Sequence, residues 1–86
     1  AIRHAGPCLV HFHVSDNDRG VPGSGHVPWS DVKAGLGDVG YDGWIVAEMF
    51  VRTGTAAGND LNIWRDIEPD ATAAAREALG FLRRTF

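Results

Sequence analysis

The sequence predicts an α/β fold in which two parallel strands alternate with two helices. Two apolar segments, 8–14 and 44–50, have the length and the β-branched and aromatic content of buried strands. Segments with helical spacing follow each of them, over 29–39 and from 69 to 86. Strands that alternate with helices pair in parallel, because each helix carries the chain back to the edge of the sheet where the previous strand began.

The first strand, "CLVHFHV", follows Gly6 and Pro7 and leads into a loop over 15–28 that is rich in Gly, Pro, Asp and Asn. Successive side chains of a strand point to opposite faces of the sheet. One face therefore carries Leu9, His11 and His13, and the other carries Val10, Phe12 and Val14.

The second strand, "WIVAEMF", is nearly continuously apolar, as is typical of a parallel strand that is covered on both faces. A polar, less regular segment over 52–66 follows it and contains the sequence "IWRD". By alternation one face of the strand carries Trp44, Val46, Glu48 and Phe50, and the other carries Ile45, Ala47 and Met49.

Both helices have recognisable ends. The first is expected from about Trp29 to Val39, with an apolar stripe of Val32, Leu36 and Val39 and with Gly40 as its C-terminal cap. The second is expected to open near Pro69, because proline suits the first turn of a helix. Its predicted buried side consists of Ala71, Ala74, Ala75, Ala78, Leu82 and Phe86.

Two parallel strands do not make a stable sheet, so more strands are expected beside them. A closed barrel of this type needs eight strand–helix units and roughly 250 residues. Residues 1–86 are therefore expected to form a single partial domain, about a quarter of a (β/α)8 barrel. The chain begins at Ala1 without a methionine, from which we expect a missing upstream part, with processing of the N-terminus as the alternative.

Composition narrows the classes of partner and compartment. The formal net charge is −3 and the sequence has no cluster of Lys and Arg, which argues against a nucleic-acid partner and against an anionic membrane surface. Cys8 is the only cysteine, so no internal disulfide forms and a reducing cytoplasm is the expected compartment. No apolar run is long enough to cross a bilayer.

Polar residues gather where each predicted strand ends. His13 closes the first strand and Glu48 comes late in the second, both with inward-pointing parity. In parallel barrels the C-terminal ends of the strands carry the active site. An imidazole and a carboxylate are natural ligands for a divalent cation such as Mn²⁺ or Co²⁺. Arg19 lies just past the first strand, where its guanidinium could hold substrate oxygens.

Each of these residues also has a purely structural interpretation. A histidine on a strand is more often a hydrogen-bonded core residue than a ligand, and we assign that role to His11. Glu48 is harder to explain this way, because a carboxylate in an apolar strand costs several kcal/mol unless it is paired or bound to metal. Arg19 taken alone is an ordinary loop arginine. His4 and His26 are expected at the surface, and Cys8 is expected to be inert packing.

Two loop motifs do not fit familiar ion or phosphate sites. The acidic run "DNDRG" lacks the spacing and terminal Glu of an EF-hand calcium loop. The stretch "GVPGSG" lacks the Lys-Ser/Thr of a phosphate-binding P-loop. The loop therefore has no assigned ligand on motif grounds alone.

Taken together, "HFHVSDNDRGVPGSGHVPW", "VGYDGWIVAEMF" and "IWRD" resemble the C-terminal part of the ketose 3-epimerases (D-tagatose and D-psicose 3-epimerases) of the xylose-isomerase-like sugar isomerase and epimerase superfamily. The resemblance implies a (β/α)8 TIM barrel of which this chain forms the seventh and eighth units. It also implies one divalent metal, Mn²⁺ or Co²⁺ with Mg²⁺ as an alternative, bound by Glu, Asp, His and Glu from four strands.

On this resemblance His13 is the histidine ligand, Glu48 is the last glutamate ligand and Arg19 binds substrate. The implied chemistry is removal of the C3 proton of a ketose, formation of a cis-enediolate and return of a proton to the opposite face. Glu48 would be one of the two catalytic carboxylates. The other glutamate, the aspartate ligand and a further substrate histidine belong to strands that this chain lacks, so an isolated monomer is expected to be inactive.

Other functions remain open. A hydroxypyruvate isomerase or an inosose dehydratase is possible within the superfamily. A non-catalytic βαβα module is the alternative of another class, in which exposed strand edges drive self-association into a homo-oligomer. We expect self-association in any case, because Leu9 and Trp44 would otherwise meet water. "NDLNIWRD" is either a cover over the barrel mouth, with Arg65 paired to an acid, or a packed surface loop.

Overall fold

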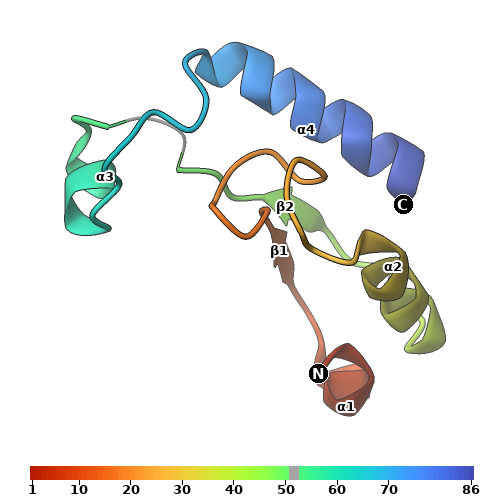
Figure 1. The fold of residues 1–86 in the computed structure, drawn as a ribbon. Coiled ribbons are helices and arrows are strands. Elements are labelled where there is room, and N and C mark those ends of the chain that lie inside the picture. The colour runs from red at the N-terminus through yellow and green to blue at the C-terminus, as the bar shows by residue number, and fades with distance from the viewer. Residues whose placement is uncertain (51–52) are drawn as a thin grey trace.

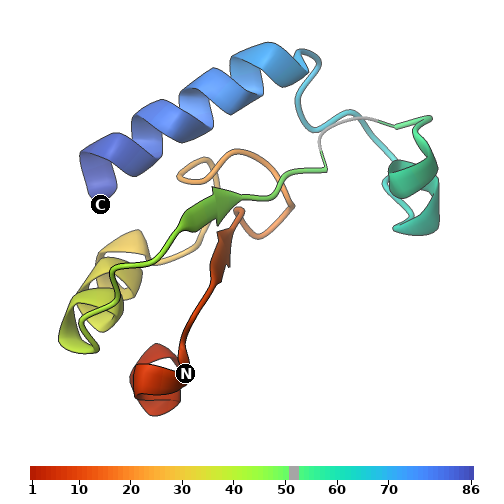
Figure 2. The ribbon, with the colours of Figure 1, turned by 180° about the vertical axis from the view of Figure 1, so that it is seen from behind.

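The computed structural model describes residues 1–50 and 53–86. Two strands lie side by side at the centre of the molecule, with α4 above them and α2 and α3 at opposite ends (Figure 1). The view from behind shows the same neighbouring strands (Figure 2). The elements are α1 (Ile2–Ala5), the 3-10 turn η1 (Gly6–Cys8), β1 (Phe12–Val14), α2 (Trp29–Asp38), β2 (Ile45–Ala47), α3 (Ala56–Asp60) and α4 (Ala71–Thr85).

The two strands are parallel, as the alternation of strands and helices predicted. Phe12 pairs with Ile45, His13 with Val46 and Val14 with Ala47. The pairing continues past β2, because the Glu48 N–H donates to the Val14 carbonyl at 2.9 Å. Inward and outward faces therefore follow the predicted alternation.

Both strands are shorter than predicted. The first begins at Phe12 instead of Cys8, and the second covers 45–47 instead of 44–50. Continued in register, residues 9–11 would pair with 42–44, where the chain turns and the Tyr41 hydroxyl donates to the Trp44 carbonyl at 2.7 Å. Cys8 lies in η1 and is exposed, so the expectation that it is packed is wrong.

Helix α2 matches its prediction to within one residue. Leu36 is buried on its predicted stripe, and the chain leaves the helix through Gly40 in the left-handed conformation (φ 65°), which favours glycine. The short helix α1, which the sequence did not predict, packs against α2. Ile2 lies so close to Gly35 that a Cβ on this glycine would be 3.3 Å from the Ile2 side chain.

Helix α4 forms the main apolar contact. Asp70 caps its start by accepting hydrogen bonds from the N–H groups of Thr72 and Ala73. Ala74 and Ala78 are buried against Val21. The other members of the predicted buried side are less covered, with Leu82 partly buried and Ala71, Ala75 and Phe86 exposed.

The buried stripe of α4 is narrow: among the described residues, the loop before α2, the β2 segment and the start of α2 lie against this helix. Ala47 and Met49 of the β2 segment and Val21 of the loop lie against the helix. Phe81, which was not in the predicted core, packs edge-on against the Trp29 ring, with the ring centroids 5.5 Å apart. The outward face of β2 is therefore covered, while the face that bears Glu48 has no helix over it among the described residues.

The segment predicted to be irregular contains the short helix α3. The Thr55 hydroxyl caps this helix by accepting from the Gly58 N–H at 3.0 Å. Asp66 accepts from both the N–H and the hydroxyl of Thr53, which closes the segment into a loop. Arg52, where the segment was expected to begin, lies outside the described residues. Within the described ranges, no helix is long and apolar enough to cross a membrane.

Candidate functional site

The loop between β1 and α2 is organised by Asp16, a role that the sequence analysis did not assign. Its side chain is 3% exposed. One carboxylate oxygen accepts from the N–H groups of Asn17 (2.9 Å) and Val27 (3.3 Å), and the other accepts from the Gly23 N–H (2.8 Å) and from Trp29 Nε1 (3.2 Å). A single buried carboxylate thus fixes the course of the loop at four points.

Glycine at position 25 allows this arrangement. A Cβ there would lie 2.2 Å from Asp16 Oδ1 and 2.1 Å from Asn17 Oδ1. The sequence signal for the loop was an acidic residue at the end of a strand followed by a run of glycines. The motifs of this loop fitted neither a calcium loop nor a phosphate loop, and no role was assigned to Asp16, whereas its carboxylate serves the loop's own backbone.

The hydrogen bonds of Asp16 favour its ionised form. Burial on its own raises the pKa of this carboxyl, but the bonds from the Asn17 N–H, the Trp29 indole and the Gly23 N–H, together with the nearby Gly25 N–H, outweigh it and lower the pKa to about 2. The group is therefore charged at neutral pH.

This pKa predicts a loss of stability in acid. Because the folded pKa of about 2 lies below the ordinary value of 3.8, Asp16 stabilises the fold above pH 3.8 and loses this contribution as the pH falls through 2. The shift corresponds to about 2 kcal/mol. Urea unfolding at a series of pH values measures this effect. Between pH 5 and pH 2, the free energy of unfolding should fall by about 2 kcal/mol more in the original chain than in Asp16→Asn. Equal losses in both proteins would contradict the assignment.

The loop delivers Arg19 to the end of the strands. Arg19 adopts a left-handed backbone conformation (φ 66°), and its N–H donates to the Asp16 carbonyl at 3.0 Å. Its own carbonyl accepts from the Phe50 N–H at 3.0 Å. These two bonds tie the arginine to both strand ends, and its Nη1 lies 3.8 Å from Glu48 Oε1.

The structure brings His13, Arg19 and Glu48 together. His13 Nδ1 lies 2.5 Å from Glu48 Oε2. His13 and Glu48 share a face because His13 is in register with Val46, two residues before Glu48. The three side chains are between 36% and 57% exposed, so a small molecule can reach them.

The core interpretation of His11 is wrong. This residue is exposed, and its Nε2 lies 2.8 Å from Nε2 of His13. It shares the inward face with His13, and no described element covers that face. The repeated histidine at i and i+2 of a strand was the signal that could have placed it in the cluster.

Glu48 is held in its ionised form. The hydrogen bond from His13 is the main cause that lowers the pKa of this carboxyl below its ordinary value; burial opposes the shift, and the charges of His13 and Arg19 add to it. An ionised carboxylate of this kind can ligate a cation or accept a proton.

The donor types fit a divalent cation in part. An imidazole nitrogen and a carboxylate oxygen lie side by side, a pair that suits Mn²⁺ or Co²⁺. Among residues 1–50 and 53–86, no group of three or more His, Cys, Asp or Glu side chains could hold a metal ion. His13 and Glu48 would therefore hold a metal only together with ligands from elsewhere.

The "IWRD" segment contacts the loop between β1 and α2. Arg65 Nη2 lies 3.3 Å from Asp18 Oδ2, which confirms the predicted pairing of Arg65 with an acid. The Trp64 side chain is 83% exposed. Its role as a cover over a barrel mouth stays a prediction. His4 and His26 are exposed, as expected.

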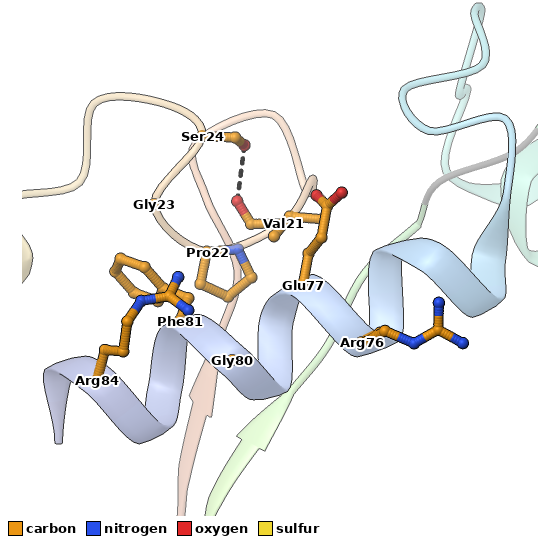
Figure 3. Close-up of a pocket in the computed structure, with 9 residues that line it drawn as sticks. All are labelled: Val21, Pro22, Gly23, Ser24, Arg76, Glu77, Gly80, Phe81 and Arg84. Atoms are coloured by element: carbon orange, nitrogen blue, oxygen red, sulfur yellow. Dashed lines mark hydrogen bonds between the residues drawn. The ribbon is translucent and has the colours of Figure 1, made fainter.

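A surface pocket of about 620 Å³ lies between the loop and α4 (Figure 3). The Ser24 hydroxyl closes the turn beside it by donating to the Val21 carbonyl at 2.6 Å. The pocket contains none of His11, His13, Arg19 and Glu48; it is lined by Val21, Pro22, Gly23, Ser24, Arg76, Glu77, Gly80, Phe81 and Arg84.

Sequence relatives place the chain in a known family. Residues 1–85 match the family model of the xylose isomerase-like TIM barrel. The D-psicose 3-epimerase of Agrobacterium fabrum is 44% identical over 88 aligned positions, which cover 96% of this chain and 30% of that protein. The D-psicose 3-epimerase of Ruminiclostridium cellulolyticum is 42% identical with the same coverage. The chain thus spans about 30% of the length of the curated relatives it matches.

Solved structures share the fold. A crystal structure of a D-psicose 3-epimerase in the presence of D-fructose superposes with a TM-score of 0.91 at 42% identity, covering 99% of this chain and 31% of that chain. A structure of an L-ribulose 3-epimerase gives a TM-score of 0.90 at 26% identity, over 99% of this chain and 29% of that one. The predicted resemblance to ketose 3-epimerases is confirmed: the chain belongs to the xylose isomerase-like TIM-barrel family and forms part of such a barrel.

Proposed function

We propose that this chain supplies part of the active site of a metal-dependent ketose 3-epimerase. His13 and Glu48 are the proposed metal ligands, Glu48 is also one of the two catalytic carboxylates, and Arg19 binds the sugar. The observation that carries the proposal is the convergence of these three side chains, with His13 Nδ1 2.5 Å from Glu48 Oε2, in a chain 44% identical to a D-psicose 3-epimerase.

The proposed reaction inverts the configuration at C3 of a ketose. A carboxylate removes the proton from C3, and the electron pair of the C–H bond forms the C2–C3 double bond of a cis-enediolate. A second carboxylate returns a proton to the opposite face of C3, so the product is an isomer of the substrate and no other atoms are exchanged. Glu48 suits one of these roles because its lowered pKa keeps it ionised.

Arg19 and the metal would stabilise negative charge on the sugar. The guanidinium of Arg19 lies 3.8 Å from the Glu48 carboxylate, within reach of the oxygens of a sugar placed at that carboxylate. A divalent cation, Mn²⁺ or Co²⁺ with Mg²⁺ as an alternative, would polarise the ketose carbonyl when bound. The remaining two ligands and the second carboxylate would come from strands outside this chain.

A grafted barrel tests the proposal. Residues 1–86 replace the matching segment of the Ruminiclostridium cellulolyticum D-psicose 3-epimerase, and conversion between D-psicose and D-fructose is measured with Mn²⁺. We expect turnover from the grafted barrel, none from the 86-residue chain alone, and loss of turnover in grafted His13→Ala. A folded grafted barrel without activity, or a His13→Ala variant with full activity, would contradict the proposal.

We further propose that the open face of the strands associates with another copy when the chain is alone in solution. Trp44, which directly precedes β2 and is predicted on the same face as Glu48, is 81% exposed, and this favours burial against a partner. Leu9, which was also expected to meet water, is partly buried. Sedimentation equilibrium should show an oligomer that weakens in Trp44→Ser but not in Trp64→Ser, which removes an equally exposed indole elsewhere. A stable monomer would contradict the proposed self-association.

The single exposed cysteine supports a reducing compartment such as the cytoplasm.

A further inference from the structure

His11 forms a ring-to-ring hydrogen bond that neither the metal ligands nor the substrate contacts require. Its Nε2 lies 2.8 Å from Nε2 of His13, and the ring centroids are 4.7 Å apart with the planes at 64°. A neutral imidazole has one N–H donor and one bare acceptor nitrogen. One of the two rings therefore donates from Nε2 and the other accepts.

This bond engages the second nitrogen of His13. Nδ1 of that ring already contacts Glu48 Oε2 at 2.5 Å, so both ring nitrogens of His13 are held. Rotation of the ring about its side-chain bonds would break both contacts. The His13 side chain is 48% exposed, and packing alone does not fix its orientation.

We propose that His11 is a positioning residue, which holds Nε2 of His13 so that Nδ1 faces Glu48 and the metal. The part that concerns the metal rests on the function proposed above. Histidines that bind metals almost always bond through the other ring nitrogen to a neighbouring group, which fixes the ring. Here that neighbour is a second imidazole from the same strand segment.

An imidazole suits this position because it works in either direction. When a neutral His13 donates from Nδ1 to the ionised Glu48, its Nε2 has no proton and accepts from His11. When Nδ1 is bare and available to a cation, Nε2 carries the proton and donates to His11. A residue that only donates or only accepts would support one of these states alone. Glutamine has both a donor and an acceptor at a similar reach, whereas leucine has neither.

The hydrogen bond is tested first in the metal-free chain. Ring nitrogens of the ¹⁵N-histidine-labelled chain are observed by NMR, and the His13 signals are identified by their loss in His13→Ala. We expect the Nε2 signal of His13 to shift in His11→Leu and to return toward its original position in His11→Gln. The exposed His26→Leu should leave it unchanged. A His13 signal that is identical in the original chain and in His11→Leu would overturn the proposal.

The effect on the metal is tested in the grafted barrel, which would supply the other two proposed ligands, by the paramagnetic broadening that Mn²⁺ causes in the His13 ring signals. We expect His11→Leu to weaken the apparent affinity roughly 10–100-fold. His11→Gln should retain most of it and His26→Leu all of it, with unchanged far-UV circular dichroism in each. Equal affinity in His11→Leu and in the unsubstituted grafted barrel would overturn the positioning role while leaving the metal site intact. Failure of Mn²⁺ to broaden His13 in the unsubstituted grafted barrel would instead contradict the proposed metal site.

Discussion

Replacing Glu48 by glutamine in the grafted barrel is expected to lower kcat for C3 epimerisation by roughly 10²–10⁴-fold. The amide keeps the size of the side chain and one oxygen near His13, but it cannot accept the C3 proton. It also removes the negative charge that His13 and Arg19 stabilise. Turnover of D-psicose at saturating substrate and Mn²⁺ measures the effect.

Two comparisons make this result specific. Glu77→Gln removes a carboxylate from the exposed side of α4 and should leave kcat unchanged. Mn²⁺ binding should weaken in Glu48→Gln as well, because one residue is assigned to both ligation and proton transfer. A Glu48→Gln protein with normal kcat would remove Glu48 from the catalytic groups.

The second large effect is expected at Asp16. Asp16→Ala leaves the N–H groups of Asn17, Gly23 and Val27 and the Trp29 indole without their acceptor. Hydrogen bonds to a charged group contribute about 1.5–3 kcal/mol each, and solvent replaces some of them. We expect the free energy of unfolding of the grafted barrel to fall by about 3 kcal/mol, measured by urea denaturation.

The same substitution should impair activity through Arg19. The Arg19 N–H donates to the Asp16 carbonyl, in the loop that the Asp16 carboxylate organises. Because Asp16→Ala loosens this loop, the Arg19 guanidinium should lose its fixed position. We therefore expect a raised KM for D-psicose in Asp16→Ala. Asp42→Ala in the exposed turn before β2 is the matched control and should change neither quantity. An Asp16→Ala protein with unaltered stability would show that the buried carboxylate does not organise the loop.

The sequence carried enough information to predict the parallel order of the strands and the contact between His13 and Glu48. Both follow from alternation, since strands and helices alternate along the chain and side chains alternate along each strand. Helix α2 was also predictable, because Gly40 marks its end and Leu36 its buried face.

The parts that were missed depend on contacts between distant segments. The strands are short because residues 42–44 turn away from 9–11, which no local pattern in 9–11 reveals. The Asp16 carboxylate binds backbone groups up to 11 residues further along the chain, which spacing alone does not indicate. His11 was assigned to a core on the assumption that both faces of the strand are covered, and its face has no cover among the described residues.

The most direct test of the account is a crystal structure of the grafted barrel soaked with Mn²⁺, with anomalous diffraction at the manganese edge. We predict one manganese peak within coordination distance of a ring nitrogen of His13 and a carboxylate oxygen of Glu48, with Arg19 beside it. A manganese ion bound by other residues, with His13 and Glu48 still hydrogen-bonded to each other, would contradict the proposed metal site.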